Sequence, residues 1–273
     1  MRESDGRIDG RELADLALET ARAAADLVRE RAARTVEVAA TKSTATDVVT
    51  EADRASEDLI RRMIAAKRPD DAFLGEEGDD IVGTSGVRWI VDPIDGTVNF
   101  LYGLPRYAVS IAAERDGEVV AGVVIDVARR IEFGAYVGDG GVVSLRDGRP
   151  IAVRPATPLS HRLIATGFSY DASLRRLQAQ CLVRFLPRVR DVRRAGSCAL
   201  DICDVAQGAL DGYLEEGVYL WDHAAAGLIA QGAGARVEVA TGLGGRRFLL
   251  VAPEHGFDEL RAAALDAGYY APE

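Results

Sequence analysis

The sequence contains few of the residue types that form thiol, imidazole and redox sites. Only three cysteines and three histidines occur among 273 residues. The cysteines form no CxxC pair and leave an odd one over, which predicts reduced thiols in a cytoplasmic protein. A cysteine nucleophile also needs a nearby histidine, so the scarcity of both types disfavours covalent thiol catalysis. The six residues are Cys181, Cys198, Cys203, His161, His223 and His255.

Long apolar runs and an excess of positive charge are also missing. No stretch of about 18 apolar residues predicts a membrane span, and residues 1–12 lack the apolar centre of a signal peptide. Asp and Glu outnumber Lys and Arg by 43 to 33, a net charge of −10, which disfavours nucleic acid as the main partner. We expect residues 1–10 to form a disordered or frayed tail and residues 11–273 to form a single domain.

Helical and strand-like patterns alternate along the chain. Apolar residues recur at helical spacing from Arg11 to about Arg34, and a second helix is expected from Ala52 to Ala66. Later helices are expected at 171–186, 199–207 and 221–231. Strands are expected at 72–74, 88–91, 107–113, 119–127, 131–137, 191–193 and 212–215. This order predicts a layered α+β or α/β sandwich but not the order of its strands.

One turn, Asp92-Pro93-Ile94-Asp95-Gly96-Thr97, combines features of a metal site and a phosphate site. A strand leads into Asp92, and Pro93 cannot continue its hydrogen-bonded ladder, so the strand is expected to stop there. Gly96 permits a tight turn, and Thr97 can begin a helix whose free amide groups suit a phosphate. The two aspartates supply carboxylate oxygens, the ligands that Mg²⁺ prefers. The alternative is an ordinary Asp-Gly turn in which Asp95 caps the next helix.

Other carboxylates occur where strands end or helices begin. Glu76 and Glu77 follow an expected strand, where adjacent like charges are unfavourable unless they are solvated or bind a metal. Asp222 stands at an expected helix start, and Asp53 lies between the first two helices. Each has a structural alternative: a solvated loop for the glutamates, a helix cap for Asp222 and a favourable first-turn acid for Asp53. The polar stretch before the second helix contains Lys42, Asp47, Thr50 and Asp53.

Several short segments together carry a family resemblance. They are Asp47 to Asp53, Gly75 to Glu77, Asp92 to Thr97 with Asn99-Phe100, Ala195 to Asp201, and Trp221-Asp222. This set resembles the inositol monophosphatase family over most of the chain, from about Leu13 to Gly234. The resemblance implies a single αβαβα sandwich and a Mg²⁺-dependent, lithium-sensitive homodimer that binds two or three ions.

The same resemblance implies roles for individual residues. The first ion would be held by Glu76, Asp92 and the backbone carbonyl of Ile94, and the second by Asp92, Asp95 and Asp222. Asp53 and Thr97, with Glu76 close by, would orient and help deprotonate the attacking water, while Gly96 and Thr97 offer backbone amides to the phosphate. Substrate hydroxyls would meet Asp95, Asp222, Glu215 and the backbone near Cys198. Glu77, Lys42 and Asp47 would support this set from outside the direct ligands.

The implied activity is hydrolysis of a small phosphomonoester by in-line attack of a metal-activated water. The segment from Val98 to Pro105, with Glu215 and Trp221-Asp222, favours myo-inositol 1-phosphate as the substrate. Histidinol phosphate or another sugar or nucleotide phosphomonoester is the alternative. A different class is an interaction protein in transcription or RNA processing, for which a basic run could serve: Arg184, Arg188, Arg190, Arg193 and Arg194. That run can equally be a solvated or dimer-facing stretch, which the acidic composition favours.

Overall fold

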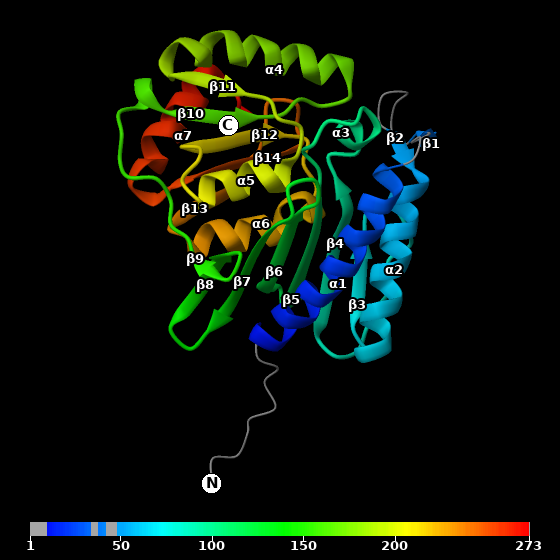
Figure 1. The fold of residues 1–273 in the computed structure, drawn as a ribbon. Coiled ribbons are helices and arrows are strands. Elements are labelled where there is room, and N and C mark those ends of the chain that lie inside the picture. The colour runs from blue at the N-terminus through cyan, green and yellow to red at the C-terminus, as the bar shows by residue number, and fades with distance from the viewer. Residues whose placement is uncertain (1–9, 34–37, 42–47, 273) are drawn as a thin grey trace.

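A computed structural model describes residues 10–33, 38–41 and 48–272, and its frame is a pair of large β-sheets (Figure 1). One sheet contains β3 (Ala72–Gly75), β4 (Val87–Asp95), β5 (Ala108–Arg115), β6 (Glu118–Asp126), β7 (Ile131–Gly138), β8 (Gly141–Arg146) and β9 (Arg149–Pro150), in that order. Its neighbours are antiparallel except β3 and β4, which are parallel.

The second sheet is built from later strands, β10 (Leu163–Thr166), β11 (Asp191–Arg193), β12 (Gly212–Glu216), β13 (Ala235–Thr241) and β14 (Arg247–Pro253). Their spatial order is β11-β10-β12-β14-β13. β10 pairs in parallel with β12, and this register brings the end of β10 beside the middle of β12. A separate antiparallel pair, β1 (Val38–Thr41) and β2 (Val48–Thr50), precedes the second helix.

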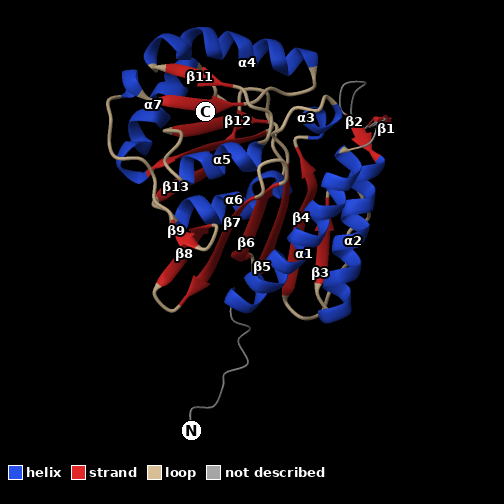
Figure 2. Cartoon of the chain, in the orientation of Figure 1, coloured by secondary structure: helices blue, strands red, loops and turns tan. Residues whose placement is uncertain are grey.

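Helices cover both sheets and separate them (Figure 2). They are α1 (Gly10–Ala32), α2 (Glu51–Lys67), α3 (Thr97–Leu101), α4 (Ala172–Phe185), α5 (Cys198–Ala206), α6 (Leu220–Gly232) and α7 (Phe257–Ala267). α1 and α2 pack on the outer face of the larger sheet, α5 and α6 lie between the sheets, and α4 and α7 cover the smaller sheet. This order confirms the predicted αβαβα sandwich. None of the helices in the described ranges is both long and apolar enough to cross a bilayer.

The helix α1 shows why the layers form where they do. Its buried residues include Ala17, Ala21, Ala24 and Val28, which recur every three or four residues and form one small, apolar stripe. Small side chains let the helix lie close to β5, β6 and β7. The predicted amphipathic helix is therefore confirmed, and α2 likewise starts one residue before the predicted position.

The strand β4 differs from the prediction, because Pro93 does not end it. β4 pairs with β5 up to Asp92 and Ser110, loses register, and pairs again at Asp95 and Ala108. A proline has no N–H to donate, so it is tolerated at such an irregularity although not within a regular ladder. The strand therefore carries both aspartates of the motif and ends at Asp95.

The end of the chain also holds elements that the pattern did not predict. β13, β14 and α7 follow the last predicted helix, and β10 (Leu163–Thr166) is a further strand that was not predicted. β14 is buried from Phe248 to Pro253, so it shows no alternation of apolar and polar residues and gives no strand periodicity. The two sheets share a core through α5 and α6, and the single domain over residues 11–273 stays a prediction.

Candidate active site

The end of β4 is a tightly bonded turn. Asp92 is buried, and its Oδ1 accepts a hydrogen bond from the Ile94 N–H at 3.0 Å. The Thr97 hydroxyl oxygen lies 3.0 Å from the Ile94 carbonyl oxygen and 3.0 Å from Asp53 Oδ1. One hydroxyl proton can be donated to only one of these two acceptors at a time. Thr97 therefore links the turn to α2 through a proton that can change partners.

Gly96 lets this turn pass between two other backbones. Its φ is +92°, in the left-handed region that favours glycine, and it is the N-cap of α3. A Cβ there would lie 3.0 Å from the Arg106 carbonyl oxygen and 3.1 Å from that of Gly196. The Asn99 side-chain amide donates to the carbonyls of Arg106 and Ala195, both at 2.8 Å. The turn is thereby held against the segment that leads into α5.

Asp95 accepts its hydrogen bonds from the N-terminus of α5, whereas the structural alternative made it the cap of the helix that follows its own turn. One of its oxygens accepts from the Ser197 hydroxyl and from the Ala199 N–H at 2.8 Å, and the other from the Cys198 N–H at 3.2 Å. These donors belong to the N-terminus of α5, where a carboxylate is favourable. The alternative in which Asp95 caps the next helix is wrong, because the N-cap of α3 is Gly96 and no side chain caps that helix. The Cys198 N–H, placed in the substrate site by resemblance, donates to Asp95.

One face of α2 contacts the acidic turn. Asp53 is fully buried, and its Oδ2 accepts from the N–H and the hydroxyl of Thr50, the helix N-cap. It is thus the first-turn acid that the structural alternative describes, and its other oxygen faces Thr97. One turn further along the helix, the Ser56 hydroxyl donates to the Pro93 carbonyl at 3.2 Å. Helix periodicity places these side chains in one row.

The next residue in this row, Glu57, holds the loop that follows β3. Its Oε2 accepts the Glu77 N–H at 2.8 Å, and its Oε1 accepts two bonds from Arg61 at 3.0 and 2.8 Å. Arg61 also donates to the Asp79 carbonyl at 2.8 Å and lies 4.2 Å from the centre of the Phe73 ring. Glu57 is 2% exposed. A buried carboxylate and its arginine therefore fix the backbone beside Glu76 and Glu77.

Carboxylates from β4, the β3 loop and α6 lie close enough to affect one another. Burial raises the pKa of Asp92 well above its ordinary value, and the negative charges of Glu76, Asp95 and Asp222 raise it further. Burial also raises the pKa of Asp222, again with help from the charges of Glu76 and Asp95. These charges interact, but among the described residues no group of three or more Asp, Glu, Cys or His side chains is arranged so that it could hold a metal ion.

Asp222 and Glu215 complete this site from the second sheet and α6. Asp222 accepts the Tyr219 N–H at 2.6 Å within a capping box, as its structural alternative describes. Glu215 lies on β12, and its Oε2 accepts the Tyr213 hydroxyl at 2.7 Å. Burial raises the pKa of Glu215 to about 7, while the bond from Tyr213 opposes the shift and the charge of Asp95 adds to it. The structure thus gathers the predicted carboxylates around the end of β4.

Two predicted residues, Lys42 and Asp47, lie outside the described ranges. Three others that hold the site were not predicted: Glu57, Ser197 and Tyr213. Glu57 follows Asp53 by four residues on a helix, and Ser197 is a typical N-cap residue before α5. Those local signals were present in the sequence. Tyr213 precedes Glu215 by two positions in a predicted strand, which places both side chains on one face, but only the structure shows that the hydroxyl reaches the carboxylate.

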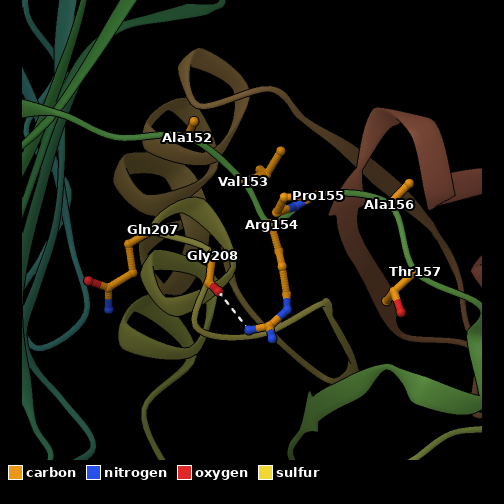
Figure 3. A pocket seen from close by; sticks show the side chains of 8 residues that line it. All are labelled: Ala152, Val153, Arg154, Pro155, Ala156, Thr157, Gln207 and Gly208. Atoms are coloured by element: carbon orange, nitrogen blue, oxygen red, sulfur yellow. Dashed lines mark hydrogen bonds between the residues drawn. The ribbon is translucent and has the colours of Figure 1, made fainter.

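A separate hollow of about 460 Å³ lies at the other end of α5 (Figure 3). Its lining includes Gln207, Gly208 and the chain from Ala152 to Thr157. Its one cation, Arg154, donates to the Gly208 carbonyl at 3.3 Å and pairs with Asp211. No row of carboxylates faces it among these lining residues. We therefore place the chemistry at the acidic end of α5 rather than in this hollow.

The sandwich and its acidic site are those of a phosphoric monoester hydrolase. The chain belongs to the inositol monophosphatase family, whose sequence model matches residues 9–266. Members of this family are generally metal-dependent.

Named relatives agree with this membership. The inositol-1-monophosphatase SuhB of Mycobacterium tuberculosis strain H37Rv is 48% identical over 230 residues, which cover 81% of this chain and 79% of that protein. The Nus factor SuhB of Pasteurella multocida is 36% identical over 225 residues, 82% of this chain and 83% of that protein. The crystal structure of the extragenic suppressor protein suhB from Bartonella henselae superposes with a TM-score of 0.85 at 32% identity, covering 93% of this chain and 98% of that one.

Proposed function

We propose that this protein hydrolyses myo-inositol 1-phosphate to inositol and phosphate with the help of Mg²⁺. The observation that carries the proposal is the cluster of Glu76, Asp92, Asp95 and Asp222, gathered at the end of β4 and flanked by Glu215. The relative from Mycobacterium tuberculosis, named as an inositol-1-monophosphatase, supports the choice of substrate. A location in the cytoplasm remains a prediction.

The oxygen donors of this cluster suit Mg²⁺, and the family resemblance implies two or three ions. Carboxylates with raised pKa values repel one another, and a cation among them would remove that repulsion. All the implied donors are hard oxygens, the type that Mg²⁺ selects over softer metals. Glu76, Asp92, Asp95, Asp222 and the Ile94 carbonyl would hold the ions, with Asp92 shared between two of them.

The chain's own groups suit in-line attack by water. Bound magnesium supplies positive charge to the phosphoryl oxygens and makes water more acidic. Thr97 and Asp53 orient the attacking water, since the Thr97 hydroxyl can accept from it while donating to Asp53 Oδ1, 3.0 Å away. The amides of Gly96 and Thr97, at the start of α3, would donate to the phosphate. Asp222 and Glu215 then receive hydroxyls of the leaving alcohol.

A panel of phosphomonoesters tests this function. Purified protein is assayed with Mg²⁺ on myo-inositol 1-phosphate, histidinol phosphate and fructose 1,6-bisphosphate, with and without lithium. We expect the highest kcat/KM on the inositol ester and inhibition by lithium. A higher kcat/KM on histidinol phosphate would overturn the substrate while keeping the phosphatase. No turnover on any ester would overturn the proposal as a whole.

Replacing Glu57 with alanine should raise the Mg²⁺ concentration needed for half-maximal rate by about tenfold. The loop that carries Glu76 would lose the hydrogen bond at the Glu77 N–H, and a bond to a charged group contributes about 1.5–3 kcal/mol. Calorimetric titration with Mg²⁺ measures the same loss without turnover. Asp58→Ala, an exposed change on the same helix, is the control. An unchanged Mg²⁺ affinity in folded Glu57→Ala would contradict the role given to Glu57.

Glu215→Gln should change substrate preference more than metal affinity. A carboxylate accepts charge-assisted bonds from substrate hydroxyls, and an amide accepts weaker ones. We expect kcat/KM for myo-inositol 1-phosphate to fall about tenfold, with a smaller fall for p-nitrophenyl phosphate, whose leaving group has no aliphatic hydroxyls. The two rates and the Mg²⁺ requirement are measured together. A shifted Mg²⁺ requirement with an unchanged preference would count against this assignment.

A second candidate function is an interaction role in transcription, because a relative is named Nus factor SuhB. Four of the five arginines in the basic run already have partners within the chain. Arg184 donates to the Ala267 carbonyl, Arg188 to Asp266, Arg190 to the His161 carbonyl and Arg193 to Asp191. Most of the run is thus committed to holding the fold. Salt-sensitive RNA binding without turnover on the panel would favour this second function.

We also infer a homodimer. Tyr102 (75%) and Leu104 (53%), two positions apart after α3, are exposed large apolar side chains that a partner surface would cover. A second copy of the chain is the occupant that the family resemblance implies. Light scattering during size-exclusion chromatography should give twice the mass of the chain, and a monomer would contradict the inference.

A further inference from the structure

The Glu215 carboxylate occupies the space that a side chain at position 167 would need, and residue 167 is a glycine. Gly167 follows β10, and a Cβ added there would lie 1.9 Å from Glu215 Oε2 and 2.1 Å from its Cδ. β10 pairs with β12 in a register that places Thr166 opposite Leu214. The residues that follow them, Gly167 and Glu215, therefore lie next to each other. Contacts this short do not occur between a Cβ and another heavy atom, because steric repulsion is prohibitive. Any side chain at position 167 therefore has to displace the carboxylate.

Tyr213 fixes the same carboxylate from the other side. Tyr213 is fully buried, and its hydroxyl donates to Glu215 Oε2 at 2.7 Å. The two residues are two positions apart on β12, so both side chains lie on one face of the sheet. Breaking this bond would take a buried hydroxyl away from its carboxylate acceptor, which is unfavourable. The absence of a side chain at Gly167 thus leaves room for the Glu215 carboxylate, and the bond from Tyr213 holds it there.

The position in which Glu215 is held is beside the acidic cluster. Its negative charge acts on Asp222 and on the thiol of Cys198, and the charge of Asp95 acts on Glu215. Arg194, an exposed cation near Gly196, also acts on it. A carboxylate in this place can accept hydroxyls from an alcohol whose phosphate lies at the start of α3. It also repels a leaving group that carries a second negative charge.

We infer that Gly167 and Tyr213 are specificity-determining positions, which select a neutral, polyhydroxylated leaving group because Gly167 leaves room for the Glu215 carboxylate and Tyr213 holds it in place. The inference rests on the proposed phosphatase function and deepens it. Both residues act through Glu215 and are positioning residues. Their contribution is to substrate preference, because a fixed carboxylate accepts hydroxyls with little loss of side-chain freedom.

The test compares selectivity in a double-mutant cycle. Selectivity is the kcat/KM for myo-inositol 1-phosphate divided by that for p-nitrophenyl phosphate. The Gly167→Ala change should lower this ratio about tenfold, and Tyr213→Phe should lower it about threefold. In a Glu215→Ala background the clashing atoms are gone, so adding Gly167→Ala should change the ratio by less than about twofold. A role limited to folding would lower both rates together instead.

Control variants keep the result interpretable. Gly134→Ala places a methyl group in β7, where the nearest other atom is 3.9 Å away, and it should leave the ratio unchanged. If Gly167→Ala does not fold, Tyr213→Phe removes a single oxygen and carries the test. An unchanged ratio in folded single variants would overturn the inference, as would an equal loss in the Glu215→Ala background. If wild-type protein prefers another hydroxylated ester of the panel, the proposed substrate fails, and the same cycle on that ester decides this inference.

Discussion

Asp92→Asn should lower kcat at saturating Mg²⁺ by about a thousandfold or more while the protein remains folded. Asparagine has nearly the same shape and keeps an oxygen that can accept the Ile94 N–H. It removes the negative charge that two ions would share. A thousandfold loss corresponds to about 4 kcal/mol of transition-state stabilisation, which is reasonable for a bridging ligand.

Asp92→Asn is not expected to lower the stability of the metal-free protein, although it lowers kcat. Burial and the neighbouring carboxylates disfavour a charge on Asp92, so the uncharged asparagine should leave the melting temperature of the metal-free protein unchanged or slightly higher. Thermal unfolding with EDTA, a calorimetric Mg²⁺ titration and kcat are measured on the same preparation. Asp79→Asn, on the exposed part of the β3 loop, is the control. Wild-type kcat in the Asp92 variant under saturating Mg²⁺ would refute the assignment of Asp92 as the bridge.

Asp53→Asn is expected to reduce kcat about a hundredfold with little change in the Mg²⁺ requirement. General-base assistance typically contributes a factor of 10² to 10⁴, and an amide cannot take the proton that the Thr97 hydroxyl donates. The oxygen of Asp53 that faces Thr97 is distinct from the one that accepts the Thr50 N–H. The expected loss is therefore catalytic, although a weakened cap should also lower stability by about 1 kcal/mol.

Two further variants separate the catalytic effect of Asp53 from its capping effect. Thr97→Ser keeps the hydroxyl and should retain most of the rate, whereas Thr97→Val should lose about as much as Asp53→Asn. Glu51→Gln changes another acid in the first turn of α2, one that is exposed, and should leave kcat unchanged. If Asp53→Asn and Glu51→Gln lose rate equally, the helix dipole rather than the Thr97 contact explains the effect.

Local patterns were sufficient for several parts of this protein. The helical spacing of apolar residues predicted α1 and α2 within two residues of their ends. The turn residues predicted the strands of the meander, and their order along the chain predicted a layered sandwich. The acidic turn from Asp92 to Thr97 could be singled out because its residue types combine an oxygen-rich site with a helix start. Such signals are readable because they depend on neighbours in the chain.

Contacts between distant segments could not be predicted in the same way. Pro93 indicated the end of a strand, yet β5 pairs with β4 on both sides of it. Asp95 has the local pattern of a cap for its own turn, but its hydrogen bonds go to Ser197 and Ala199, more than a hundred positions away. Gly167 has no motif around it. Its importance follows from the register of β10 on β12, and register is set by packing of whole layers.

The acidic turn and the family motifs were therefore determined by the sequence itself, because residue type and spacing along the chain define them. Tertiary structure alone decided which donors bond to Asp53, which helix holds Asp95, and what holds Glu215. Those features depend on distances through space between elements that the chain connects only by long paths.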